Sequence, residues 1–125
     1  MKYKDFTEFP VWQRGFKLVL KIYEVTKNYP SEERFGIISD IRRAANSITH
    51  NIAEGFGREG TKDKCNFYKT SRGSAYEIIS QTLVSHALSY LQEKDKNEIV
   101  TECKKIIEEL NSMIKFLKDN TNRKP

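Results

Sequence analysis

Three glycines in the middle of the chain have the spacing of a phosphate-binding loop. Gly55, Gly57 and Gly60 in the stretch EGFGREGTK fit G-x-G-x-x-G, a pattern whose glycines let the backbone approach a pyrophosphate. That chemistry requires a β-strand before the loop and a helix after it. The preceding segment, IRRAANSITHNIAEG, instead has the periodicity of an amphipathic helix. The glycines are therefore interpreted as the end of one helix and the turn into the next.

A weaker phosphate-binding hypothesis remains for the same loop. Arg58 and Lys62 flank it, and the free N–H groups at the start of the following helix, with two cations, can hold one phosphate of a polymer. A P-loop is excluded, because Thr61 precedes Lys62 where that motif has lysine before serine or threonine. The competing interpretation is a pair of solvated surface cations.

A second group of polar residues lies beside the apolar stripe of the segment before the glycines. Its members, with the two residues expected to face them from the next helix, are Arg43, Asn46, Ser47, Asn51, Glu54, Ser74 and Glu77. Such a group is compatible with a catalytic cluster or with a buried polar network that fixes helix register. Because no nucleophile–base pair or metal-ligand set accompanies it, we favour a structural network and predict no catalytic residue. The network is predicted to contain Asn51, Glu54, Ser74 and Glu77.

Four helices must position these residues. Apolar residues recur at intervals of three and four, which predicts helices over about 10–29, 32–56, 61–92 and 95–119. The connections are short, so consecutive helices should be antiparallel neighbours. The predicted fold class is all-α, a single-domain, up-down-up-down, antiparallel four-helix bundle that occupies residues 1–125.

Several local features accompany this prediction. Ser31 is expected to cap the second helix, and Asp95 with Glu98 to open the fourth as a capping box. Gly73 lies in mid-helix, where it costs ~1 kcal/mol relative to alanine, so it is expected to mark a close contact with another backbone. The predicted apolar face of the first helix consists of Trp12, Phe16, Val19, Ile22, Tyr23 and Thr26.

Positive charge is concentrated in the middle of the chain. The 125 residues carry a net charge of +5, and residues 34–72 hold eight basic and four acidic side chains, including five of the seven arginines. A local basic excess attracts phosphates, although an ordinary solvated helical hairpin is an equally open interpretation. The residues predicted to bind nucleic acid are Arg42, Arg43, Arg58, Lys62 and Arg72.

The remaining composition suggests a cytoplasmic protein. The start MKYKDFTEFP has no signal-peptide core, and no run approaches the roughly 20 apolar residues of a membrane span. Cys65 and Cys103 are expected to lie too far apart for a disulfide and to remain free thiols. His50 and His86 have no ligand-spaced partners, so no metal, cofactor or small-molecule substrate is predicted.

Long stretches of the chain resemble a known family. VWQRGFKLVLKIYEVTKNYP, YPSEERFGI, IRRAANSITHNIAEGFGR and RGSAYE are similar to motifs of the ribosomal large-subunit RNA intervening-sequence protein family, over residues 6–117. The signature positions that match are Arg42, Arg43, Asn51, Glu54, Gly55, Arg58, Gly73, Ser74 and Glu77. Gly15 departs from the pattern, because alanine is usual there.

The resemblance implies a small four-helix bundle, and some members are encoded inside insertions of large-subunit ribosomal RNA genes. A related branch, the accessory variability protein of diversity-generating retroelements, forms a basic homopentameric barrel that works with a reverse transcriptase and nucleic acid. The family gives none of the signature residues a settled catalytic role. By resemblance, a homopentamer and an RNA or reverse-transcriptase-like partner are expected.

Three functional hypotheses follow from these observations. The first is a non-enzymatic homo-oligomer that binds RNA, other nucleic acid or an RNA-acting protein through a basic surface. The second is a protein–protein scaffold with no nucleic-acid role, which the neutral charge balance of residues 73–125 suits. The third, an enzyme using Arg43, Asn51, Glu54 and Glu77, is disfavoured.

Overall fold

The computed structural model describes residues 3–123, which form four long helices and two short 3₁₀ turns. The helices are α1 (Pro10–Thr26), α2 (Ile37–Gly57), α3 (Thr61–Ala87) and α4 (Glu93–Arg123). The 3₁₀ turns are η1 (Phe6–Glu8), before α1, and η2 (Ser31–Glu33), between α1 and α2. These residues contain no strand, so the all-α prediction is confirmed, and so is the absence of a strand before the glycine-rich loop.

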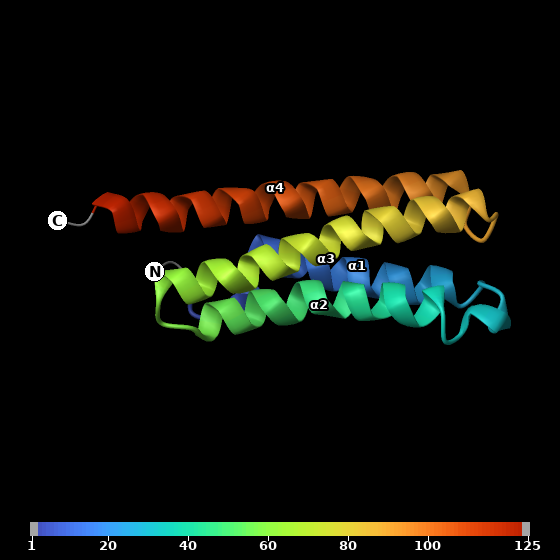
Figure 1. Ribbon diagram of the computed structural model, residues 1–125, viewed down its shortest axis with the longest axis horizontal. Helices are drawn as coiled ribbons and strands as arrows, with labels where there is room; N and C mark the ends of the chain where they lie inside the picture. Colours follow the sequence, from blue (N-terminus) through green and yellow to red (C-terminus); the bar gives the residue numbers. More distant parts are fainter. Residues whose placement is uncertain (1–2, 124–125) are drawn as a thin grey trace.

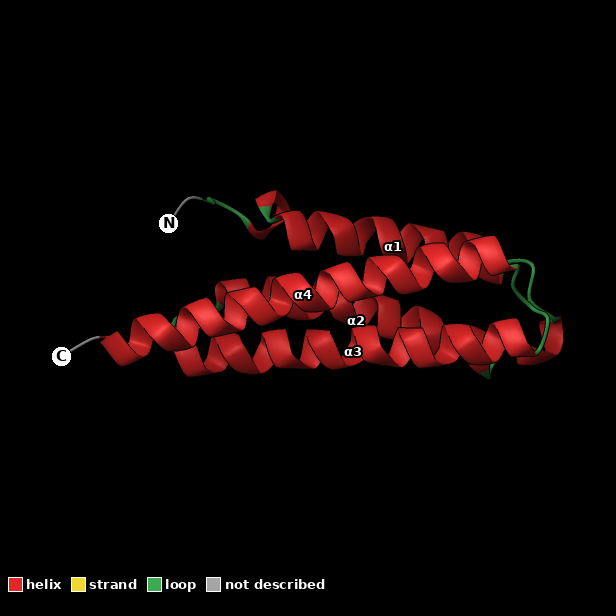
Figure 2. Ribbon diagram, turned by 90° about the horizontal axis from the view of Figure 1, so that it is seen from above, coloured by secondary structure: helices red, strands yellow, loops and turns green. Residues whose placement is uncertain are grey.

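The helices form an elongated bundle in which consecutive helices run in opposite directions (Figure 1). The start of α1 and the end of α4 lie at the same end of the bundle, as four antiparallel helices require (Figure 2). α2 packs most extensively on α3, and α1 packs least on α4. α1 and α3 are diagonally opposite, because neither packs on the other. None of the helices within residues 3–123 has the length and apolar character that crossing a membrane demands.

The core is built mainly from aliphatic side chains on the inward stripe of each helix. α2 contributes isoleucines at intervals of four and seven, and its alanines let the neighbouring helices come close. α4 contributes the stripe that its heptad spacing predicts, which includes Ile99, Cys103, Ile106 and Leu110. Cys65 and Cys103 are both buried and both free, as expected.

The predicted inward face of α1 is wrong for two of its six members. The residues that α1 buries are Val11, Gly15, Leu18, Ile22, Val25 and Thr26. Of the predicted stripe, Ile22 and Thr26 are buried, Trp12 and Val19 are partly buried against the core, and Phe16 and Tyr23 are exposed. The reason is close packing at Gly15, where an added Cβ would lie 3.0 Å from a methyl of Thr49. This approach turns the aliphatic stripe inward and leaves the aromatic stripe outside.

The start of the second helix also differs from the prediction. Residues 31–33 form the turn η2, and α2 begins only at Ile37. Ser31 makes no capping bond; instead the backbone N–H of Ile37 donates to the Glu33 carboxylate at 3.4 Å. Gly36 separates η2 from α2, because its backbone (φ −109°, ψ −116°) is neither helical nor extended.

The third helix ends five residues before the predicted boundary at residue 92. Ser89 has a left-handed backbone with φ 65°, which ends the helix at Ala87. The N–H of Tyr90 donates to Ser85 O at 2.9 Å and the N–H of Ser89 to His86 O at 2.9 Å, the two bonds of a Schellman motif. Glycine usually occupies this left-handed position, but here the residue is Ser89. The sequence therefore gives no signal that the helix ends.

The fourth helix begins at Glu93 and continues to Arg123, beyond both predicted limits of 95 and 119. Asp95 and Glu98 therefore lie inside the helix and do not form its capping box. Gly73 also contradicts its prediction: it is exposed, and no atom lies within 4 Å of the position a Cβ would take. The glycine that does mark a close contact is Gly55, whose added Cβ would be 2.6 Å from the Tyr68 ring.

Candidate nucleic-acid interface

The glycine-rich turn connects two helices and has no strained backbone. α2 ends at Gly57, and Gly60 is the N-cap of α3. None of the described glycines has a positive φ. Arg58 folds back on α2, where its Nη2 lies 3.3 Å from Glu54 Oε2 and its guanidinium carbon lies 4.7 Å from the centre of the Phe67 ring. Lys62 is exposed in the first turn of α3.

Part of the polar group between α2 and α3 is joined by hydrogen bonds centred on Ser47. The Ser74 hydroxyl donates to Ser47 Oγ at 2.8 Å, and Asn51 Nδ2 donates to Ser47 O at 2.8 Å and to Ser47 Oγ at 3.0 Å. Nearby, the buried Ser71 hydroxyl donates to Ile48 O at 2.9 Å. Residue numbers rise on α2 as they fall on α3, which fixes the antiparallel register of this pair.

Glu54 and Glu77 are not bonded to this serine–asparagine cluster. Glu54 pairs with Arg58, and Glu77 lies 3.8 Å from Arg43 Nη2, whose closer partner is Asp40 at 3.2 Å. The side chains of Arg43 and Glu77 are both substantially exposed. The cluster therefore acts as a register-fixing contact, and the two carboxylates act as counter-ions for surface arginines.

The five predicted cations occupy three different faces of the bundle. Arg43 and Arg58 lie on the α2/α3 face, about 22 Å apart along the axis at 1.5 Å per residue. Arg42 lies on the α1/α2 face, Arg72 on the α3/α4 face and Lys62 beside the α2–α3 turn. The structure does not gather them into one patch.

Arg42 is held in place by neutral partners. Its Nε donates to Thr26 Oγ1 at 2.9 Å and its Nη2 to Tyr23 O at 3.4 Å, while its guanidinium carbon lies 4.5 Å from the centre of the Tyr23 ring. Tyr23 is oriented in turn by Asn46, whose Nδ2 donates to the phenol oxygen at 3.0 Å. Within residues 3–123, Arg42 has no carboxylate at ion-pair distance, so its charge is oriented but not neutralised.

Arg72 has a comparable environment on the opposite side of α3. Its Nη1 donates to Asn111 Oδ1 of α4 at 2.7 Å, and in the part of the chain that the structure describes it forms no ion pair. The positive charge of Lys62 is likewise not paired with any described carboxylate. Arg42, Lys62 and Arg72 therefore differ from Arg43 and Arg58, which already have acidic partners.

Lys64 contributes a feature that the sequence reasoning missed. Its Nζ donates to the carbonyl oxygens of Phe56 at 2.9 Å and Gly55 at 3.2 Å, which caps the C-terminal end of α2. Burial lowers the pKa of Lys64. A lysine seven residues after the end of a helix is a weak signal, because only the folded turn brings its side chain back to that end.

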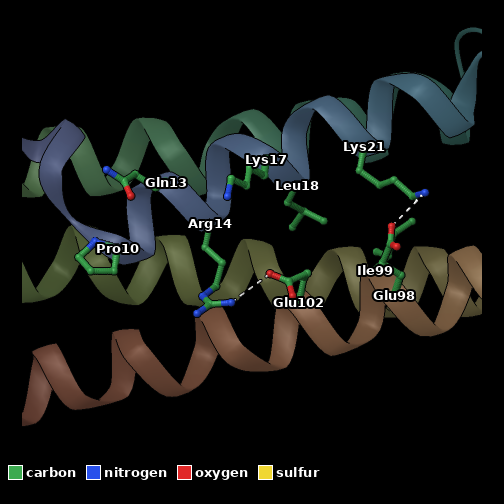
Figure 3. A pocket seen from close by; sticks show the side chains of 9 residues that line it. All are labelled: Pro10, Gln13, Arg14, Lys17, Leu18, Lys21, Glu98, Ile99 and Glu102. Atoms are coloured by element: carbon green, nitrogen blue, oxygen red, sulfur yellow. Dashed lines mark hydrogen bonds and ion pairs between the residues drawn. The ribbon is translucent and has the colours of Figure 1, made fainter.

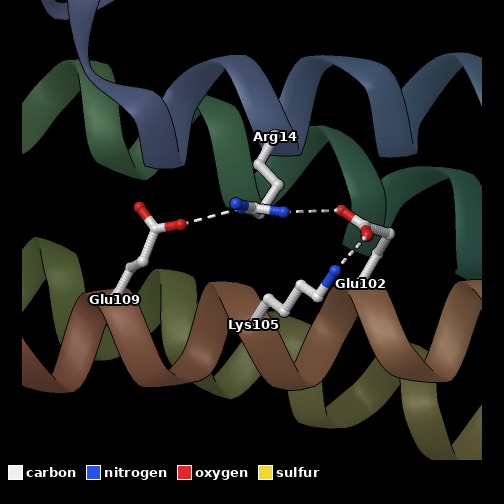
Figure 4. Close-up of polar contacts among 4 residues, drawn as sticks. All are labelled: Arg14, Glu102, Lys105 and Glu109. Carbon is white, nitrogen blue, oxygen red and sulfur yellow. Dashed lines mark hydrogen bonds and ion pairs between the residues drawn. The ribbon is translucent and has the colours of Figure 1, made fainter.

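The seam between α1 and α4 was also missed. Arg14 bridges two carboxylates of α4, with Nε at 2.8 Å from Glu109 and Nη1 at 3.3 Å from Glu102 (Figure 4). Lys105, on α4 itself, also pairs with Glu102 at 3.6 Å (Figure 4). The hydrogen bond to Glu109 is the main cause that raises the pKa of Arg14.

Lys21 makes the second connection across this seam. Its Nζ lies 2.8 Å from Asp95 and 2.9 Å from Glu98, and these hydrogen bonds raise the pKa of Lys21. A surface groove of about 500 Å³ runs between the two ion-pair groups, with charged side chains reaching across it from both helices (Figure 3). Because its central cations are already paired, this groove offers few free charges to a ligand.

Comparisons with known proteins relate this arrangement to one family. The family model described as 23S rRNA-intervening sequence protein matches residues 7–112. A search of the curated proteins finds no match.

A solved structure is also similar, with a TM-score of 0.78 over 84% of this chain and 98% of that chain. It is the crystal structure of a protein of unknown function from the S23 ribosomal protein family of Bacteroides thetaiotaomicron. The two sequences are 22% identical, so this similarity concerns the fold alone. Neither description names a reaction. On the match over residues 7–112, the chain belongs to the 23S rRNA-intervening sequence protein family.

Proposed function

We propose that the protein is a non-enzymatic, homo-oligomeric helical bundle that binds RNA through cations of α2 and α3. The observation that carries this proposal is the state of Arg42 and Arg72. Thr26 and Tyr23 orient the guanidinium of Arg42, and Asn111 orients the guanidinium of Arg72. Because these partners are neutral, each arginine keeps an uncompensated positive charge at the surface. Pre-oriented donors without a counter-ion can bind a phosphate without first breaking an ion pair.

The paired cations are assigned a smaller role. To bind a phosphate, Arg43 must give up its ion pair with Asp40, and Arg58 its ion pair with Glu54. The loss of these ion pairs cancels part of the binding free energy that the phosphate contacts supply. The acidic partners thus divide the cations that the sequence predicted into two groups. Lys62 belongs with the unpaired group because it is exposed beside the α2–α3 turn. Two free buried thiols suit a reducing compartment, so the cytoplasm is the proposed location.

The test is binding of a structured RNA, measured by fluorescence anisotropy over a salt series. The triple variant Arg42→Gln, Lys62→Gln, Arg72→Gln should bind at least tenfold more weakly at low salt. The slope of log affinity against log salt should fall by about 0.7–0.9 for each phosphate that the variant no longer neutralises.

A matched variant separates local contacts from net charge. Lys27, Lys104 and Lys118 are exposed and lie outside the proposed surface, so changing all three to glutamine removes the same charge. This variant should stay within threefold of the unchanged protein. Equal weakening by both triple variants, or no binding by the unchanged protein at low salt, would refute the proposed surface.

A protein–protein scaffold is the second candidate, and a specific groove favours it. The groove has a volume of about 710 Å³ and lies between the N-terminal segment, the start of α1, α3 and the C-terminal half of α4. Its lining is largely apolar and includes Phe9, Tyr68, Met113 and Phe116. A protein partner that stays bound after nuclease treatment, but does not bind the Phe116→Glu variant, would support this function.

A further inference from the structure

The apolar groove beside the start of α1 has two hydrogen-bond donors in its wall. Its volume of about 710 Å³ lies within the range of about 300–1,000 Å³ that sites for small molecules have. Most of its lining is apolar and includes Phe9, Val11 and Met113. The two donors are Lys64 and Tyr68, which both belong to α3. A groove of this kind can hold a molecule that is apolar except at one end.

Tyr68 is a buried tyrosine whose hydroxyl lacks a partner. The residue is only 3% exposed, yet it lines the groove, and no described residue forms a hydrogen bond with its hydroxyl. Burial raises the pKa of Tyr68 to about 12, so the hydroxyl keeps its proton at neutral pH and remains a donor. Because buried polar groups are normally hydrogen-bonded, this hydroxyl indicates a ligand that accepts a hydrogen bond.

Lys64 brings a positive charge to the same wall. Its Nζ donates to the carbonyl oxygens of Phe56 at 2.9 Å and Gly55 at 3.2 Å, and an ammonium group has a third N–H to donate. In the part of the chain that the structure describes, no carboxylate lies at ion-pair distance from it. Burial lowers the pKa of Lys64, because apolar surroundings disfavour an unpaired charge. An anion beside Lys64 would offset this cost.

The two donors converge on Gly55 of α2. Lys64 Nζ lies 3.2 Å from Gly55 O, and a Cβ added to Gly55 would lie 3.1 Å from Tyr68 Cζ, the ring atom that carries the hydroxyl. Lys64 and Tyr68 are also four residues apart, on one face of α3. The acidic residue of the lining, Glu109, is already paired with Arg14 at 2.8 Å (Figure 4). The uncompensated charge of the groove is therefore positive.

We propose that the groove binds a small carboxylic acid with an apolar body, and that its carboxylate accepts hydrogen bonds from Lys64 and Tyr68. The two oxygen atoms of a carboxylate can accept from both donors at once, and charge-assisted hydrogen bonds are stronger than neutral ones. The apolar body then leaves water against the apolar wall. The site is separate from the cations proposed for RNA, and it gives the protein a small-molecule ligand that the sequence did not predict.

Isothermal titration calorimetry with decanoate, below its micelle concentration, tests this site. Decanoate should bind with one molecule per chain, and decanol, which has the same chain without the charge, should bind about tenfold or more weakly. Tyr68→Phe removes only the hydroxyl, and Lys64→Met removes only the charged end of the side chain. Each variant should weaken the binding of decanoate about tenfold and leave the binding of decanol unchanged.

Lys69→Met is the matched control, because Lys69 is exposed on α3 and does not line the groove. It should bind decanoate like the unchanged chain. Circular dichroism checks that each variant is helical, and Tyr68→Phe alone decides the test if Lys64→Met loses its fold with the cap of α2.

Absence of decanoate binding, equal affinity for decanol, full binding by Tyr68→Phe or equal weakening by Lys69→Met would overturn the inference. Tighter binding of an apolar peptide amide, which has no carboxylate, would also overturn it and would assign the groove to a protein partner. RNA is absent throughout, so the RNA-binding proposal and this inference can fail independently.

Discussion

Two glycines of the chain show how the same residue type serves opposite purposes. Gly55 is buried in α2 against the Tyr68 ring, and a Cβ there would approach Tyr68 Cε1 to 2.6 Å. Gly55→Ala should therefore destabilise the fold by about 1–3 kcal/mol through overpacking. Gly73 is exposed in mid-helix with open space around it, so Gly73→Ala should stabilise by roughly 1 kcal/mol.

Urea unfolding at several protein concentrations measures both changes, because a contribution from assembly would depend on concentration. If Gly55→Ala proves neutral, the contact between α2 and the Tyr68 ring is looser than the structure shows. If Gly73→Ala destabilises the monomer, the space above Gly73 is not free. The pair is a sensitive check because the two predictions have opposite signs.

The burial of the Cys103 thiol predicts that the free energy of unfolding decreases at alkaline pH. The thiol is fully buried, and this burial raises the pKa of Cys103 to about 12. In the unfolded chain a cysteine titrates near pH 8.5, so the raised folded-state pKa contributes stability that is fully present below that pH. The contribution is lost as pH rises toward 12, at up to about 1.4 kcal/mol per pH unit. Stability should fall between pH 8.5 and 10.5.

Urea unfolding at a series of pH values checks this, with Cys103→Ala as the comparison. The variant should be less stable at pH 7, because it leaves a small cavity, and its stability should decline less steeply above pH 8.5. Tyr68 adds a similar effect above pH 10, since burial raises the pKa of Tyr68 to about 12. Parallel pH profiles for the two proteins would show that Cys103 ionises without unfolding.

At the scale of helices, the prediction succeeded where a helix has one apolar face and failed where it has two. α4 has a single regular stripe, and its buried residues Ile99, Cys103, Ile106 and Leu110 follow the intervals of three and four that predict the helix. α1 carries an aliphatic stripe and an aromatic stripe side by side, and only the contact at Gly15 decides which one turns inward. That contact involves Thr49 of α2, so the first thirty residues contain both stripes but do not show which of them is buried.

The end of α3 and the neutral partners of two arginines could not be predicted from the sequence either. Ser89 adopts a left-handed backbone without the glycine that normally announces it. Arg43 and Arg58 meet carboxylates three and four residues earlier in the chain, Asp40 and Glu54, and this spacing is visible in the sequence. The neutral partners that orient Arg42 and Arg72 lie on other helices, so only the register between helices reveals them.

The α1–α4 seam predicts a salt-dependent contribution to stability. Arg14 and Lys21 link the two least extensively packed neighbouring helices through carboxylates of α4. The pairs are partly exposed, so Arg14→Gln or Lys21→Gln should each cost only about 0.5–1 kcal/mol after allowance for solvent screening. The loss should shrink at 1 M salt.

Thermal unfolding at low and high salt measures this effect. Lys115→Gln is the control, because Lys115 pairs with Asp119 on the exposed surface of α4 alone and joins no two helices. It should change the melting temperature less than either seam variant. A seam variant that costs several kcal/mol at every salt concentration would indicate that the aliphatic parts of these side chains, not their charges, hold the seam.

At the scale of the whole molecule, assembly and RNA binding should respond to salt in opposite ways. The exposed large apolar side chains include Leu20 on α1 and Leu83 on α3, so an apolar contact between copies should persist at 0.5 M salt, whereas phosphate contacts weaken steeply over the same range. The particle mass should stay constant while RNA is released. A homo-oligomer would also repeat Arg42, Lys62 and Arg72, so one RNA could engage several copies at once.

A single copy keeps all three cations but loses this repetition, so dilution that dissociates the oligomer should weaken RNA binding per subunit at least tenfold. Anisotropy at low salt measures the affinity, and light scattering at the same concentrations measures the particle mass. If dissociated copies bind as tightly as the oligomer, each copy binds RNA by itself. Dissociation of the oligomer by salt in parallel with RNA release would instead show that charge, not apolar contact, holds the copies together.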